Sequence, residues 1–90
     1  MRTGRYSFDH VTYDPPSDVL YARLNDAKTA ERRQTEQGDV WTLDEAGRPT
    51  GLIVIEPRDR FERDGAVYIT LPTGERERLQ RVESAISRPA

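Results

Sequence analysis

The sequence predicts a small α+β domain, in which an antiparallel β-sheet of four or five strands carries one C-terminal amphipathic helix. Three observations lead to this prediction. Short runs of β-branched and aromatic residues alternate with turns that contain proline or glycine. Apolar residues recur at helical spacing near the end of the chain. The length of 90 residues is sufficient for one domain, so we expect residues 1–90 to form a single unit.

Residues 10–43 contain the first strands. Residues 10–13 form a short strand that stops at two prolines, because proline fixes φ and lacks an N–H donor. Residues 19–24 alternate in a way that is typical of a strand with one buried face. Residues 29–36 are polar and fit either an edge strand or a loop, so both alternatives stay open. Residues 39–43 are the next strand.

The segment 52–55 differs from these strands because all four of its residues are apolar. A strand with one side in water would alternate, so we expect both faces of this strand to be covered. A charged connector follows over residues 56–64, and residues 66–71 form a further strand. We therefore expect another helix or strand, or a second chain, to pack on the second face of this strand.

The last segment, residues 75–87, has the spacing of an amphipathic helix. Leu79, Val82 and Ile86 fall on one side of such a helix, with Arg and Glu on the other side. We expect this helix to pack over Ile53 and Ile55, which are the residues that lack a cover.

Four residues stand out as a candidate site, namely Asp14, Asp18, Asp44 and Gly47. The first two flank a proline pair, and residues 44–47 have the Asp and Gly that a type I turn prefers. We interpret all four as structural turn residues, because aspartate accepts hydrogen bonds from amides just downstream. The alternative is an acidic cluster of the three aspartates that binds Mg²⁺ or Ca²⁺ or acts as acid and base, should both turns meet at one end of the sheet. We assign no catalytic, cofactor-binding or metal-binding residue.

A pattern over residues 11–57 resembles a known family. It consists of a Tyr-Asp pair, an Asp four residues later, an apolar-Tyr strand, an Asp-x-x-Gly turn and a Gly before an apolar strand, formed here by Tyr13, Asp14, Asp18, Leu20, Tyr21, Leu24, Asp44, Gly47, Gly51, Leu52 and Val54. In order and spacing this resembles the domain of unknown function 2283 family of small bacterial proteins. Ile53 departs from the acidic residue common in that family, and residues 58–90 are an extension. The resemblance implies no catalytic residues, and it implies an antitoxin-like role beside a small toxin-like partner.

The composition argues against several classes of protein. There is no cysteine for a disulfide or a thiolate, and His10 as the only histidine leaves zinc without a ligand set. The net charge is −2 with both signs interspersed, whereas nucleic-acid binders concentrate positive charge on one face. The sequence has neither an 18-residue apolar run nor a hydrophobic stretch near Met1, so we expect a cytoplasmic protein without a membrane partner.

The leading hypothesis is a non-catalytic protein-interaction module that binds itself as a homodimer or binds another small protein. Ile53 and Ile55 are the candidate interface, because their strand is apolar on both faces. The first alternative is a weak nucleic-acid binder that uses the arginines of the second half, namely Arg58, Arg60, Arg63, Arg76, Arg78 and Arg81. The second alternative is a metal-dependent enzyme at the Asp turns.

Overall fold

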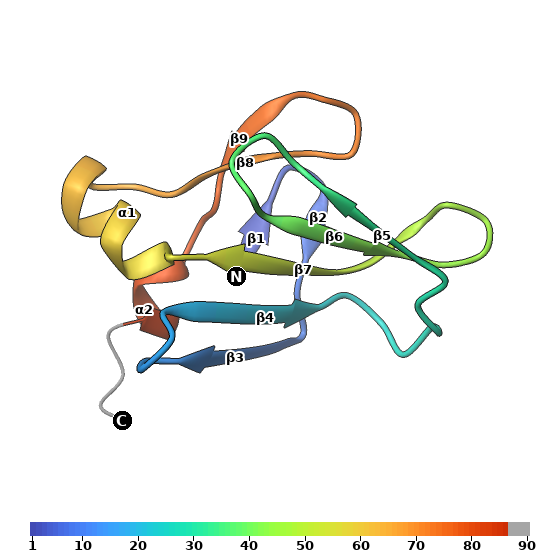
Figure 1. Ribbon diagram of the computed structural model, residues 1–90, viewed down its shortest axis with the longest axis horizontal. Coiled ribbons are helices and arrows are strands. Elements are labelled where there is room, and N and C mark those ends of the chain that lie inside the picture. Colours follow the sequence, from blue (N-terminus) through green and yellow to red (C-terminus); the bar gives the residue numbers. More distant parts are fainter. Residues whose placement is uncertain (87–90) are drawn as a thin grey trace.

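A computed structural model describes residues 1–86. Its centre is an antiparallel sheet of five strands in the order β3-β4-β7-β6-β5 (Figure 1). The strands, in this order, are β3 (His10–Asp14), β4 (Val19–Arg23), β7 (Pro49–Ile55), β6 (Val40–Leu43) and β5 (Glu31–Gln34). The expected antiparallel sheet is therefore present, and residues 29–36 contain its edge strand β5.

Two ribbons and two short helices complete the described chain. The ribbons pair β1 (Arg2–Thr3) with β2 (Tyr6–Ser7) and β8 (Tyr68–Thr70) with β9 (Arg76–Arg78). The helices are α1 (Pro57–Asp64) and α2 (Val82–Ile86). In Figure 1 the N-terminal ribbon and α2 lie behind the sheet, and α1 extends beyond the end of β7. Within residues 1–86, no helix has the length and apolar character needed to cross a membrane.

One face of the sheet carries the hydrophobic core. Side chains alternate along β4, β6 and β7, so that the core face consists of Leu20, Ala22, Trp41, Leu43, Leu52 and Val54, all buried. The ribbons, the chain beside them and α2 cover this face with Phe8, Val67, Ile69, Leu71, Leu79, Val82 and Ile86. Trp41 also contacts the β8–β9 ribbon, because its Nε1–H donates a hydrogen bond to Thr70 O at 2.8 Å.

The opposite face of the sheet is only partly shielded. Its central side chains are five apolar residues on three neighbouring strands, which we call the open face: Val19, Tyr21, Val40, Ile53 and Ile55. Tyr21 is 49% exposed, and the other four are half-buried. Gly51 continues this side of β7 toward the other end, where an added Cβ would come within 2.7 Å of Ala22 O. Glycine at this position therefore lets β4 and β7 approach closely.

The predicted C-terminal helix is present, but it is shorter than expected and does not cover the residues assigned to it. Residues 76–78 belong to β9, and the helix comprises only Val82–Ile86. Its buried residues share the core with Leu52 and Val54, while Ile53 and Ile55 lie on the other face of β7. The helix therefore does not shield Ile53 or Ile55 from solvent. Position 87 of the predicted helix lies outside the described residues.

Two further expectations are corrected. The charged connector 56–64 is mostly the helix α1, which begins at Pro57, ends at Asp64 and is capped by Gly65 with φ 75°. Proline suits the first helical position because the N–H that it lacks would have no partner there. The predicted strand 66–71 contains β8, but this strand pairs with β9 instead of joining the five-stranded sheet.

Candidate functional site

Asp18 holds the first turn of α1, although it lies 40 residues before that turn. Its Oδ1 accepts hydrogen bonds from the Tyr13 hydroxyl at 2.8 Å and from the Arg58 N–H at 3.0 Å. Its Oδ2 accepts one from the Asp59 N–H at 3.1 Å. Glu56, at the N-cap position, makes no side-chain cap of its own. Asp18 thus satisfies two of the amides that a helix leaves unpaired at its N-terminus.

Tyr13 joins this corner of the molecule to α1. Burial, and then the carboxylate of Asp18, raise the pKa of its hydroxyl. The Arg58 guanidinium lies 5.3 Å from the centre of the Tyr13 ring and also donates a hydrogen bond to Ile86 O. The β3–β4 turn, α1 and α2 are therefore tied together by polar contacts around one tyrosine.

A buried ion pair between Asp39 and Arg60 lies at the same end of the sheet. The side chain of Asp39 is fully buried and that of Arg60 is 13% exposed. Asp39 Oδ1 accepts hydrogen bonds from the Arg60 guanidinium and from the Ile55 N–H, the latter at 2.9 Å. Arg60 Nε–H also donates to Ile55 O at 3.0 Å. The pair connects the start of β6, the end of β7 and α1.

Asp39 was not among the predicted site residues, and it has one unusual feature. Its second carboxylate oxygen, Oδ2, is buried without a hydrogen-bond partner among residues 1–86. No local pattern in the sequence marks Asp39 or Arg60, because one precedes a strand and the other lies in a charged segment. Only the pairing of distant elements brings the two side chains together.

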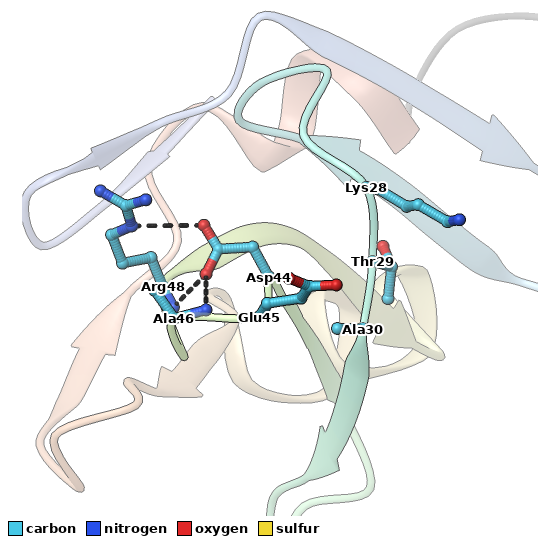
Figure 2. A pocket seen from close by; sticks show the side chains of 7 residues that line it. All are labelled: Lys28, Thr29, Ala30, Asp44, Glu45, Ala46 and Arg48. Carbon is cyan, nitrogen blue, oxygen red and sulfur yellow. Dashed lines mark hydrogen bonds and ion pairs between the residues drawn. The ribbon is translucent and has the colours of Figure 1, made fainter.

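Asp44 organises the turn between β6 and β7. Its Oδ1 accepts hydrogen bonds from the Ala46 and Arg48 amides, both at 2.9 Å, and its Oδ2 accepts one from Arg48 Nε–H at 3.2 Å. Gly47, with φ 79°, donates its N–H to Asp44 O at 3.0 Å. Figure 2 shows this turn beside residues 28–30. The two segments line a depression of about 570 Å³. The Asp44 carboxylate is therefore engaged by its own turn.

We expect Asp44 to titrate below its usual value in the native protein. The hydrogen bond from the Arg48 amide is the main cause of the lowered pKa, with further contributions from the Ala46 amide and the Arg48 side chain. The stabilisation that this carboxylate gives is present above its unfolded pKa and is lost as the pH falls through the lower native value. NMR titration of the Asp44 carboxyl in the native protein and in urea measures both values. Equal midpoints would contradict the prediction.

The two groups of acidic residues lie at opposite ends of the sheet. Asp14 and Asp18 flank the turn before β4, and Val19 pairs with Ile55 at the end of β7. Asp44 precedes the start of β7. The alternative of one acidic cluster is therefore wrong. Asp14 instead accepts a hydrogen bond from the Ser17 hydroxyl. Residues 1–86 contain no group of three or more His, Cys, Asp or Glu side chains that could hold a metal ion.

Several arginines of the second half are engaged within the protein. Arg58 donates to Ile86 O, Arg60 is paired with buried Asp39, and Arg63 lies 3.4 Å from Asp59. Arg76 lies 5.8 Å from the centre of the Tyr68 ring. These contacts turn guanidinium groups toward the protein's own acceptors and rings.

The open face is the remaining candidate, and it is a surface rather than a pocket. Ile53 on β7 is paired with Tyr21 on β4 at one side and with Val40 on β6 at the other. Val19 pairs with Ile55 in the next row. The sequence had pointed to Ile53 and Ile55. The alternation in residues 19–24 also places Val19 and Tyr21 on one side, but it does not reveal which strands are neighbours.

Comparison of the chain with protein-family models, with curated proteins and with solved structures gave no match. The resemblance to the domain of unknown function 2283 family stays a prediction.

Proposed function

We propose that this protein is a non-catalytic protein-binding module and that the open face is its binding surface. The observation that supports the proposal is the row of apolar side chains on a sheet face that residues 1–86 leave partly accessible. A sheet face of this kind gains free energy when a second apolar layer removes it from water. Contiguous apolar surface with a central aromatic residue is typical of protein interfaces.

The same observations favour a protein over nucleic acid as the partner. The open face is apolar at its centre, and the arginines expected to contact phosphate include Arg58, Arg60 and Arg63, which already have acceptors within the chain. Phosphate binding would require positive charge that is free to replace counterions. The family resemblance adds a specific form to the proposal, in which the bound protein is a small toxin-like partner.

Replacing Tyr21 with lysine is expected to weaken partner binding at least about tenfold, because it puts a charge at the centre of the apolar row. The matched control is Tyr68→Lys, since Tyr68 is 46% exposed on β8, away from the open face. Affinity-tagged wild type and both variants are used to capture proteins from host cells, including untagged copies of this chain, and the captured proteins are quantified by mass spectrometry. Tyr21→Lys should lose a protein that wild type and Tyr68→Lys retain. If all three capture the same proteins in equal amounts, the open face is not the binding surface.

A further inference from the structure

We propose that the partner of the open face is a second copy of this chain, packed sheet against sheet about a two-fold axis that runs across the strands. The proposal rests on the proposed function, because it names the partner of the same surface. Three features of the open face carry it: a row of side chains with an apolar centre that can face itself, a difference in charge between the two ends of the strands, and the position of the β4–β5 connection at one end.

One row of side chains, apolar at its centre, crosses the whole sheet. Thr12, Tyr21, Ile53, Val40 and Gln34 are successive neighbours in the register of β3, β4, β7, β6 and β5. Its three central residues are apolar and its two outer residues are polar and exposed. Sheets pack face to face about 10 Å apart. A second copy can therefore place its apolar centre on the apolar centre of the first while both polar edges stay in water.

The charged side chains that the strands themselves place on this face differ between its two ends. Asp14 lies at one end, next to Val19 and in line with Ile55. Arg23 and Arg32 lie at the other end, with His10 beside Arg23. An axis along the strands would put like ends over like ends. An axis across the strands puts the acidic end of each copy over the basic end of the other, which is the complementary arrangement.

The connection from β4 to β5 lies at the basic end. Arg23, whose side chain projects on this face, donates hydrogen bonds to Asn25 O at 3.1 Å and to Ala27 O at 3.3 Å. Further along, the Thr29 hydroxyl lies 3.5 Å from that of Thr50. Figure 1 shows this connection running around the end of the sheet to reach β5. An axis along the strands would bring the two copies of this connection together, whereas an axis across the strands places them at opposite ends of the dimer.

The size of the face predicts a weak dimer. Five strands about 4.8 Å apart, with about five residues each rising 3.3 Å, cover roughly 19 by 17 Å. This is about 320 Å² per copy, below the total of about 1,200–2,000 Å² that stable interfaces bury, so we expect a transient dimer with a dissociation constant in the micromolar range or weaker.

Sedimentation equilibrium between about 5 and about 500 µM tests the association. The wild-type mass should rise from 10.3 kDa toward twice that value. Tyr21→Lys should stay at the monomer mass, or dissociate at least about tenfold more readily, while the control Tyr68→Lys follows the wild type. Matching circular dichroism spectra establish that both variants are folded. A wild-type mass that stays at 10.3 kDa throughout overturns the proposal, as does a dimer that Tyr21→Lys leaves intact.

Cross-linking through introduced cysteines tests the direction of the axis. The chain has no cysteine of its own, so each variant reacts at a single known position. Single variants Thr12→Cys and Gln34→Cys are treated with a bismaleimide that spans about 10 Å, the distance between packed sheets. An axis across the strands predicts that each variant cross-links to itself. An axis along the strands puts β3 over β5, so only a mixture of the two variants would react. If two copies instead paired through one edge strand, either β3 or β5, only the variant with its cysteine on that strand would cross-link to itself. Either of the last two patterns overturns the proposed geometry.

Failure of the dimer and failure of the binding face give different results. A wild-type protein that stays monomeric, but captures a foreign protein that Tyr21→Lys loses, overturns self-association and leaves the binding face in place. A Tyr21→Lys variant that changes neither the mass nor the captured proteins overturns both.

Discussion

Replacing Asp39 with alanine is expected to lower the free energy of unfolding by about 3–5 kcal/mol, the range for breaking one side of a buried ion pair. Asp39 is fully buried, and its removal leaves the Arg60 guanidinium and the Ile55 N–H without their acceptor. A domain of this size has a stability near the low end of about 5–15 kcal/mol. The variant should therefore be close to unfolding at room temperature. Urea denaturation followed by the fluorescence of buried Trp41 measures the change.

The matched control is Glu31→Ala, which removes an ion pair with Arg33 whose side chains are 53% and 55% exposed. Exposed pairs contribute about 0–1 kcal/mol, so this variant should unfold close to the wild type. Asp39→Asn should fall between the two, because it keeps the shape and one acceptor oxygen but loses the charge. A cost for Asp39→Ala no larger than that for Glu31→Ala would show that the buried pair is not what fastens α1 to the sheet.

The second largest effect is expected for Asp18→Ala, at about 2–5 kcal/mol. The estimate combines the loss of a helix cap, about 0.5–2 kcal/mol, with the loss of a hydrogen bond from Tyr13 to a charged acceptor, about 1.5–3 kcal/mol. Asp18 also has φ 52°, a conformation that Asp and Asn tolerate better than alanine. Asp18→Asn should therefore cost less than alanine, since it keeps one acceptor and suits the backbone.

Hydrogen exchange identifies the mechanism behind this loss. The amides in the first turn of α1, at Arg58 and Asp59, should exchange much faster in Asp18→Ala, because their acceptor is gone. Asp14→Ala serves as a control in the same turn, since the Asp14 carboxylate is bonded to Ser17 and not to α1. Unchanged protection at Arg58 and Asp59 in Asp18→Ala would mean that Asp18 is not the cap.

The strands of the central sheet could be predicted because their signals are local. Pro15 and Pro16 end one strand, and the Asp and Gly of residues 44–47 make the turn before another. Helix α1 could not be predicted in this way, since its cap, Asp18, comes from a turn 40 residues earlier in the chain. The helical spacing of residues 75–87 was misleading for a related reason. Leu79 is buried next to β9, so its spacing to Val82 reflects two elements that meet in one core.

The candidate site was predictable only in part. An apolar run at residues 52–55 indicates a strand that needs cover on both faces, and Ile53 and Ile55 do lie on the less shielded face. Which element covers which face depends on the path of the chain after β7, and no periodicity encodes that path. The neighbours of Ile53, Tyr21 and Val40, likewise follow from the strand order β4-β7-β6, which places sequence-distant strands side by side.

A dilution series observed by NMR tests most directly the claim that the open face is a protein-binding surface closed by a second copy. Amide shifts of wild-type protein are recorded from about 500 to about 5 µM, a range that spans a micromolar dissociation constant. The largest changes should fall on the row that crosses the sheet, at Tyr21, Ile53 and Val40, while β8 and β9 stay unchanged. Spectra that do not change with concentration, or changes confined to the ribbons and helices, would contradict self-association through the open face.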